Sequence, residues 1–242
     1  MMAKVWMTDR YGLNSFSGGE KLGSSTGPFR ALNLGRKVGD EPSVVERNRS
    51  DLANALGLRS IRYMDQVHSA LCEVVTDPNK AESAVDAIIL TRNEISDSLG
   101  IAVQVADCVP VVVESDGAVM AIHVGREGLF KGITEKALDE FCEIAENSSV
   151  KALVGPSICG NCYPLSRELY LSIVQRYPAT KFDEDENKVD VAAGVLSILD
   201  KREIPWQWFG GKRECVSCDS GYFSYRRDAT TGRQAMVVAF SE

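Results

Sequence analysis

Two histidines and one cysteine are the side chains of this chain best suited to bind a metal ion. His68 and His123 are the only histidines among the 242 residues, and Cys108 lies between them in the sequence. Each of the three stands beside a short apolar run, close to where a predicted strand ends. Zinc in catalytic sites commonly takes three ligands of these types and leaves a fourth position for water or substrate. The pattern predicts a three-ligand zinc site, although an isolated histidine is more often a packed or surface residue.

The same thiol supports a second interpretation, in which Cys108 is a nucleophile and a histidine is its base. Both interpretations need a thiolate, so the sequence does not separate a Cys-His hydrolase from a zinc enzyme. Asp107 and Glu127 are the candidate acids or bases beside the site. Either carboxylate could instead orient a ligating imidazole.

Two C-x-x-C pairs, Cys159/Cys162 and Cys215/Cys218, form a second group of candidate ligands. Four cysteines in paired spacing can close a structural zinc site. However, 53 positions separate Cys162 from Cys215, which is longer than the spacing of compact zinc knuckles. Buried free thiols are therefore the ordinary interpretation. A redox role is weaker still, because neither pair opens a helix after a strand.

The stretch from residue 100 to 129 must position Cys108 and His123. β-Branched runs predict strands there over 101–105, 109–113 and 119–122. Further runs on either side predict two strands or one bent strand within 61–76, and strands over 85–90 and 150–154. Helical spacing predicts helices from Asp40, as cap, to Gly57, over 129–144 and over 165–177, and one capped by Asp190. A solvated helix face is the ordinary interpretation of Asn48 and Arg49. A hairpin with its turn near Thr231 is predicted at the end of the chain.

Strands mostly follow strands here instead of alternating with helices. The sequence therefore predicts an α+β fold with a mixed or antiparallel sheet, in one domain spanning 1–242. Hydrophobic residues make up 44% of this chain, enough to bury a large core.

Composition narrows the class of protein further. The net charge of −7 and the pI near 5.1 argue against non-specific nucleic-acid binding and against binding to anionic membranes. No apolar run reaches the roughly 18 residues of a membrane span, and the N-terminus does not resemble a signal peptide. Seven cysteines without a secretion signal indicate reduced thiols. A cytoplasmic protein is expected.

Several segments occur in an order that resembles a known family: LNLGRKVGDEPSVVERNR, QVH, ADCVPVVV, AIHVG, VGPSICGNCY, DVAAGVLSIL and FSYRRDATTGRQA. They resemble the bacterial laccase-domain family of YfiH type, also called polyphenol-oxidase-like or purine nucleoside phosphorylase proteins. The resemblance covers nearly the whole chain. It implies a layered α/β/β/α domain with mixed sheets and a zinc site at His68, Cys108 and His123.

The resemblance implies phosphorolysis of adenosine, inosine and methylthioadenosine, a transferase reaction, and deamination of adenosine, a hydrolase reaction. Zinc can activate water at neutral pH for attack on the purine carbon that bears the amino group. Arg49, Arg226 and Arg227 are the candidate ligands of phosphate, because an arginine fork suits its geometry. The ordinary interpretation of Arg226 and Arg227 is a solvated hairpin face.

The chain departs from the family pattern directly after His123. Where the family reads H-A-G-W-R-G, this chain has Gly125 followed by Arg126 and Glu127. The departure predicts an altered substrate site, and it favours an inactive family member as an alternative. A true multicopper laccase is rejected, because two histidines cannot ligate both a blue copper and a trinuclear cluster. Copper remains an alternative occupant of the zinc site.

Overall fold

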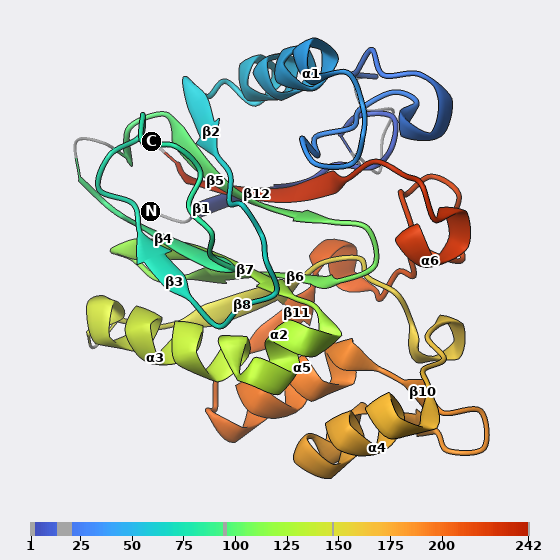
Figure 1. Cartoon of the computed structure of the whole chain (residues 1–242). Helices are drawn as coiled ribbons and strands as arrows, with labels where there is room; N and C mark the ends of the chain where they lie inside the picture. Colours follow the sequence, from blue (N-terminus) through green and yellow to red (C-terminus); the bar gives the residue numbers. More distant parts are fainter. Residues whose placement is uncertain (1–2, 14–20, 94–95, 147, 242) are drawn as a thin grey trace.

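The computed structural model describes residues 3–13, 21–93, 96–146 and 148–241 (Figure 1). In chain order the strands are β1 (Ala3–Met7), β2 (Ser60–Arg62), β3 (Cys72–Val74), β4 (Ala87–Thr91), β5 (Leu99–Val105), β6 (Val109–Glu114), β7 (Ala118–Val124), β8 (Lys151–Val154), β9 (Lys181–Asp183), β10 (Lys188–Val189), β11 (Trp206–Trp208) and β12 (Gln234–Phe240). The α-helices are α1 (Pro42–Ala55), α2 (Arg126–Lys131), α3 (Ile133–Ala145), α4 (Arg167–Arg176), α5 (Val191–Lys201) and α6 (Tyr225–Asp228). Within the described residues, no helix combines the length and the apolarity that a membrane crossing requires.

Two mixed sheets form the centre of the molecule. The first has four strands in the order β1-β12-β5-β2, and only its β2–β5 pair is parallel. The second has six strands in the order β11-β8-β6-β7-β4-β3, with parallel pairs at its two edges. The α+β class with mixed sheets is confirmed.

The sheets stack face to face between helices, which gives the α/β/β/α layers (Figure 1). Helix α1 covers the outer face of the four-stranded sheet, and α2, α3, α4 and α5 lie on the outer side of the six-stranded sheet. Strand β6 shows how alternation builds the layers. Val111 and Val113 pack toward the helices, whereas Val112 packs into the core between the sheets. Strands β6 and β7 are therefore buried on both faces.

The helix predicted over 129–144 is in fact two helices. Gly132 ends α2 in the left-handed conformation, with φ of 86°, and α3 begins at the next residue. Glycine adopts this conformation without a steric penalty. The cap predicted at Asp190 is confirmed, because its side chain accepts a hydrogen bond from the backbone N–H of Ala193. The cap predicted at Asp40 is wrong: Glu41 occupies the cap position of α1.

The solvated face expected at Asn48 and Arg49 is also wrong. Asn48 is fully buried, and its side-chain amide donates to the backbone oxygen of Asn33 at 2.9 Å. Arg49 is 6% exposed and donates to the backbone oxygen of Leu34 at 2.8 Å. Both side chains tie α1 to the segment before it, because buried donors need partners.

The predicted C-terminal hairpin is also wrong. The segment before β12 contains the short helix α6, and β12 instead pairs with β1 and β5. A local alternation of apolar residues does not say which strand is the partner. The consequence for function is that Arg226 and Arg227 stand on α6 and not on a hairpin.

Candidate metal centre

His68, Cys108 and His123 come together at the place where the two sheets meet. Their ligand atoms all lie within 4.8 Å of one another, and Cys108 Sγ is 3.7 Å from His68 Nε2. His68 belongs to the connection between β2 and β3, Cys108 follows β5 where the chain passes to the other sheet, and His123 lies near the end of β7. The three predicted ligands are thus assembled from three separate segments.

Backbone conformation contributes to this assembly. His68 has φ of 56° and Asp107 has φ of 114°, values that residues with a side chain rarely adopt. Such conformations persist only where the surrounding structure holds them, and they cluster at functional sites. Here they turn His68 and Cys108 toward each other.

Asp86 fixes the imidazole of His123 and the backbone of His68, and it was not predicted from the sequence. Its carboxylate accepts a hydrogen bond from His123 Nδ1 at 2.8 Å and one from the backbone N–H of His68 at 3.0 Å. It also accepts from the backbone N–H and the hydroxyl of Ser69. Because Nδ1 of His123 is committed to Asp86, Nε2 is left to face the cluster. The available signal was a carboxylate placed directly before the apolar strand β4.

The absence of a side chain at Gly125 leaves space for the ligands of the cluster. A Cβ atom at this position would lie 2.6 Å from His68 Cδ2, 2.8 Å from His68 Nε2 and 3.0 Å from Cys108 Sγ. Any side chain at residue 125 would therefore occupy the space between two of the ligands. The glycine of the His-x-Gly segment is required by this close approach.

Electrostatics in the cluster favour a thiolate and a protonated imidazole. Burial alone would raise the pKa of the Cys108 thiol, but the charge and hydrogen bonds of His123 and His68 outweigh it and lower that pKa to about 6. Burial would lower the pKa of His123, but Cys108 and Asp86 raise it to about 9. The pKa of Asp86 falls to about 2, since the bonds from His123 and Ser69 outweigh burial. The cluster thus prepares the anionic sulfur that a metal or a nucleophilic reaction requires.

The donor set fits zinc. Bonds of about 2.3 Å to sulfur and 2.0–2.1 Å to nitrogen place ligand atoms roughly 3.5 Å apart around a tetrahedral ion. The 3.7 Å separation of Cys108 Sγ and His68 Nε2 agrees with that geometry. Three ligands leave a fourth position open, which is the arrangement of catalytic zinc sites.

The cluster forms part of the wall of a cavity of about 670 Å³, a volume suited to a small organic ligand. Arg126, Arg226 and Arg233 are among the lining residues, as is Tyr163. Arg226 stacks over the Tyr163 ring with its guanidinium carbon 4.8 Å from the ring centroid. The cavity therefore combines a metal-binding cluster, an aromatic face and several cations.

The predicted phosphate ligands take three different positions. Arg226 and Arg49 line the cavity, but Arg49 donates to Glu82 at 2.6 Å and to a backbone oxygen. Arg227 is not among the described residues that line it. Its guanidinium donates to the backbone oxygens of Val216 and Tyr222, at 2.8 and 2.7 Å.

Two further arginines supply the charge that the sequence analysis did not assign. Arg126 lines the cavity and forms no ion pair with another described residue. Arg233 is largely enclosed, and burial lowers its pKa below the ordinary value. In the segment after His123, this chain has its arginine at residue 126, one position earlier than in the pattern H-A-G-W-R-G, and this arginine lines the cavity.

The two predicted acid–base carboxylates also differ in position. Asp107 lines the cavity, and its oxygens accept hydrogen bonds from the Ser224 hydroxyl and the backbone N–H of Arg226, each at 2.6 Å. Burial raises its pKa above the ordinary value despite these bonds. Glu127 is about half exposed, forms an ion pair with Lys131 at 2.6 Å and is not among the described lining residues.

The fold and the cluster together define a class: layered α/β/β/α proteins in which two histidines and a cysteine, a group that could hold a metal ion, come together where the two sheets meet. A family model described as multi-copper polyphenol oxidoreductase laccase matches residues 16–241. The chain belongs to this laccase-domain family.

Relatives and solved structures agree with this assignment. A Streptomyces griseus protein named purine nucleoside phosphorylase ORF3 is 35% identical, over 96% of this chain and 92% of the relative. An Escherichia coli protein named purine nucleoside phosphorylase YfiH is 32% identical over 89% of each chain. The structure of YlmD from Geobacillus stearothermophilus has a TM-score of 0.80 at 26% identity, over 99% of this chain and 92% of that one.

Proposed function

We propose that this chain is a zinc-dependent purine nucleoside enzyme. It cleaves adenosine, inosine and methylthioadenosine by phosphorolysis and also deaminates adenosine. The observation that carries the proposal is the position of the His68–Cys108–His123 cluster on the wall of the 670 Å³ cavity, close to Arg126 and Arg226. A metal site, cations for phosphate and a cavity of nucleoside size are the parts that these reactions need.

The residues of the site divide the work. His68, Cys108 and His123 hold zinc, which when bound supplies a Lewis acid beside the substrate. Asp86 keeps Nε2 of His123 directed at the ion. Arg226, like Arg126 and Arg233, donates to phosphate oxygens, and paired N–H groups suit this anion. The ring of Tyr163 offers a face on which a purine can stack.

Asp107 holds the start of α6, and with it Arg226, against the cavity. Its acid–base role requires the carboxylate to exchange one of these hydrogen bonds for a bond to the substrate. Burial raises the pKa of this carboxyl above its ordinary value, which is the direction of shift that a general acid requires. Glu127 points to Lys131 and has no part in the proposed chemistry.

Turnover of adenosine, with and without phosphate, tests the proposal. The protein is purified with its metal content quantified, and a Cys108→Ala variant and a Cys142→Ala control are assayed beside it. We expect adenine with phosphate and inosine without it, and loss of both products in Cys108→Ala alone. Protein that holds zinc but converts no nucleoside would contradict the proposal and favour an inactive member, altered at Arg126 and Glu127.

A Cys-His thiol hydrolase is the second candidate, favoured by the lowered pKa of Cys108 and by its 3.7 Å approach to His68 Nε2. A nucleophilic thiolate must be free of metal, so the two functions exclude each other at this sulfur. Purified protein without zinc, inactivated by stoichiometric alkylation of Cys108, would establish this alternative. Zinc that protects Cys108 from alkylation would exclude it.

A further inference from the structure

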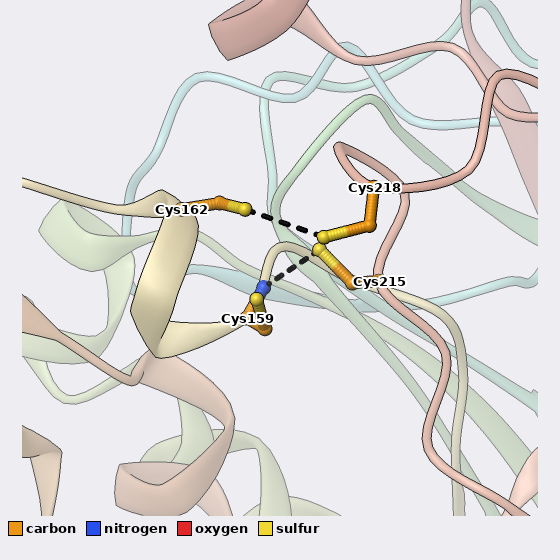
Figure 2. Close-up of side chains that lie close together, drawn as sticks. All are labelled: Cys159, Cys162, Cys215 and Cys218. Carbon is orange, nitrogen blue, oxygen red and sulfur yellow. Dashed lines mark hydrogen bonds between the residues drawn. The ribbon is translucent and has the colours of Figure 1, made fainter.

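The two C-x-x-C pairs, which the proposed function does not use, meet in space (Figure 2). The Sγ atoms of Cys159, Cys162, Cys215 and Cys218 all lie within 4.8 Å of one another, and those of Cys162 and Cys218 are 3.4 Å apart. All four are free thiols; three are half-buried, and Cys218 is exposed. The ordinary interpretation as buried free thiols is therefore wrong about burial: the thiols are free, but they are clustered and only partly buried.

Backbone hydrogen bonds hold the two pairs in register. The backbone N–H of Ser157 donates to the oxygen of Glu214, and that of Val216 donates to the oxygen of Ser157, both at 3.2 Å. The backbone N–H of Cys159 donates to Cys215 Sγ, also at 3.2 Å (Figure 2). Hydrogen bonds to a ligating atom orient it and tune the site. The cluster is thus preorganised by segments that lie far apart in the sequence.

Each pair bends so that its two sulfurs face the other pair. The backbone N–H of Cys162 donates to the oxygen of Cys159 at 3.0 Å across the short helix η3 (Gly160–Cys162). In the other pair, the backbone N–H of Asp219 donates to the backbone oxygen of Cys215 at 3.1 Å. Figure 2 shows the four side chains directed toward one centre.

The sulfur separations suit a metal better than a disulfide. Four sulfurs at about 2.3 Å from a tetrahedral zinc lie roughly 3.8 Å from one another. The sulfurs of Cys162 and Cys218 are 3.4 Å apart, and every pair of the four sulfurs lies within 4.8 Å, so the observed separations are compatible with that distance. A disulfide would bring two sulfurs to about 2.05 Å, much closer than the 3.4 Å between the sulfurs of Cys162 and Cys218.

Positive charge next to the cluster complements four thiolates around one divalent ion. Arg213 interacts electrostatically with Cys159 and Cys215, and Lys188 interacts with Cys162. Four thiolates around one divalent cation carry two net negative charges. Arg213 and Lys188 reduce this charge in part, since each also pairs with a carboxylate, of Asp190 and of Glu186.

We propose that Cys159, Cys162, Cys215 and Cys218 bind a structural zinc ion, separate from the three-ligand site. Four protein ligands close the coordination shell, so this ion takes no part in chemistry. It joins the segment that carries Ile158 and Tyr163 to the segment that leads into α6. Ile158 and Tyr163 line the cavity, as do Tyr225 and Arg226 of α6, so the ion fixes one of its walls.

Metal content gives the first test, measured by elemental analysis of the protein as purified. We expect two zinc equivalents in the wild type and one in Cys162→Ser/Cys218→Ser, with the remaining equivalent lost on adding Cys108→Ala. A Cys142→Ser control, whose cysteine lies outside both clusters, retains both equivalents. Circular dichroism checks that each variant is folded. A single equivalent in the wild type that disappears in Cys108→Ala would overturn the proposal.

Two further measurements examine the four thiols with all four cysteines intact, and the second uses the native wild type. Cobalt added to metal-free Cys108→Ala protein should give the intense charge-transfer and visible absorption of a tetrahedral thiolate site. In the native wild type, the four cysteines should resist alkylation until a chelator is added, as read by peptide mass spectrometry. Four thiols that react without chelator, or a Cys162–Cys218 disulfide, would overturn the second zinc site whether or not the nucleoside activity exists.

Discussion

At the scale of single residues, the smallest side chain of the metal centre has the largest steric consequence. Gly125→Ala places a methyl group 2.6 Å from His68 Cδ2, closer than real Cβ atoms come to another heavy atom, and 3.0 Å from Cys108 Sγ. We expect loss of most bound metal from the three-ligand site, with the fold retained. Elemental analysis beside circular dichroism measures both.

Gly117→Ala is the matched control, because a Cβ atom there meets nothing within 4 Å. It should keep the metal content of the wild type. Equal metal content in the two variants would show that the site adapts to the added methyl group and that Gly125 is not required for it.

A substitution of Asp86 tests whether a carboxylate that orients a ligand is needed for zinc affinity. Asp86→Asn replaces the acceptor of the His123 Nδ1–H bond with a group that can turn its amide nitrogen toward the ring. We expect zinc affinity to fall about 10- to 100-fold, the usual effect of losing such a partner. Competition with a chromophoric chelator measures it. Asp65→Asn, which alters a cavity carboxylate paired with Lys37, should leave the affinity unchanged.

At the scale of elements, α6 carries two adjacent arginines with opposite tasks. Arg227 donates to several backbone oxygens, so Arg227→Ala leaves buried acceptors unpaired and should cost roughly 1.5–3 kcal/mol of the free energy of unfolding. Arg226 stacks on Tyr163 and faces the cavity, so Arg226→Ala should leave stability within about 0.5 kcal/mol of the wild type. Urea unfolding measures both.

The same pair separates binding from stability in the assay. Arg226→Ala should raise the KM for phosphate about 10-fold or more, since a charge-assisted hydrogen bond is lost. Arg227→Ala, measured well below its unfolding midpoint, should retain the KM of the wild type. The reverse result would assign phosphate binding to Arg227 and would contradict the assignment drawn from the cavity.

Helix α1 depends on a buried amide for its position. Asn48→Ala removes the acceptor of the Ser24 N–H and the donor to the Asn33 oxygen, at 2.9 Å each. We expect a loss of roughly 2–3 kcal/mol in the free energy of unfolding. Asn54→Ala changes the same residue type on the exposed face of α1 and should be close to neutral. Equal urea midpoints for the two variants would refute this role of Asn48.

The elements also show which parts of the fold and of the site can be predicted from the sequence. Continuous apolar runs predict β4, β6 and β7, because a strand that is buried on both faces is apolar along nearly its whole length. The ligand types of His68, Cys108 and His123 predict the metal centre for a similarly local reason. Asp86, Arg233 and the partners of β12 are fixed by contacts between distant segments, and no local period encodes such contacts.

At the scale of the whole molecule, the metal centre joins the two sheets. His68 lies between a strand of one sheet and a strand of the other, and Cys108 lies on a second crossing between them. In the proposed function, zinc would bind the assembled site and not the unfolded chain, so its binding free energy would add to the free energy of unfolding. A metal ion at this site should therefore stabilise the packing of the α/β/β/α layers, which an ion on the surface would not do.

Metal removal tests this coupling. A chelator should lower the urea midpoint of the wild type, and added zinc should restore it, with a stabilisation of about 4 kcal/mol when free zinc exceeds the dissociation constant 1,000-fold. Cys108→Ala keeps the four-cysteine cluster, so the zinc response it retains belongs to that cluster. The difference between the two responses measures the three-ligand site. If the wild type and Cys108→Ala respond equally, that site does not join the sheets, and its role is confined to the chemistry in the cavity.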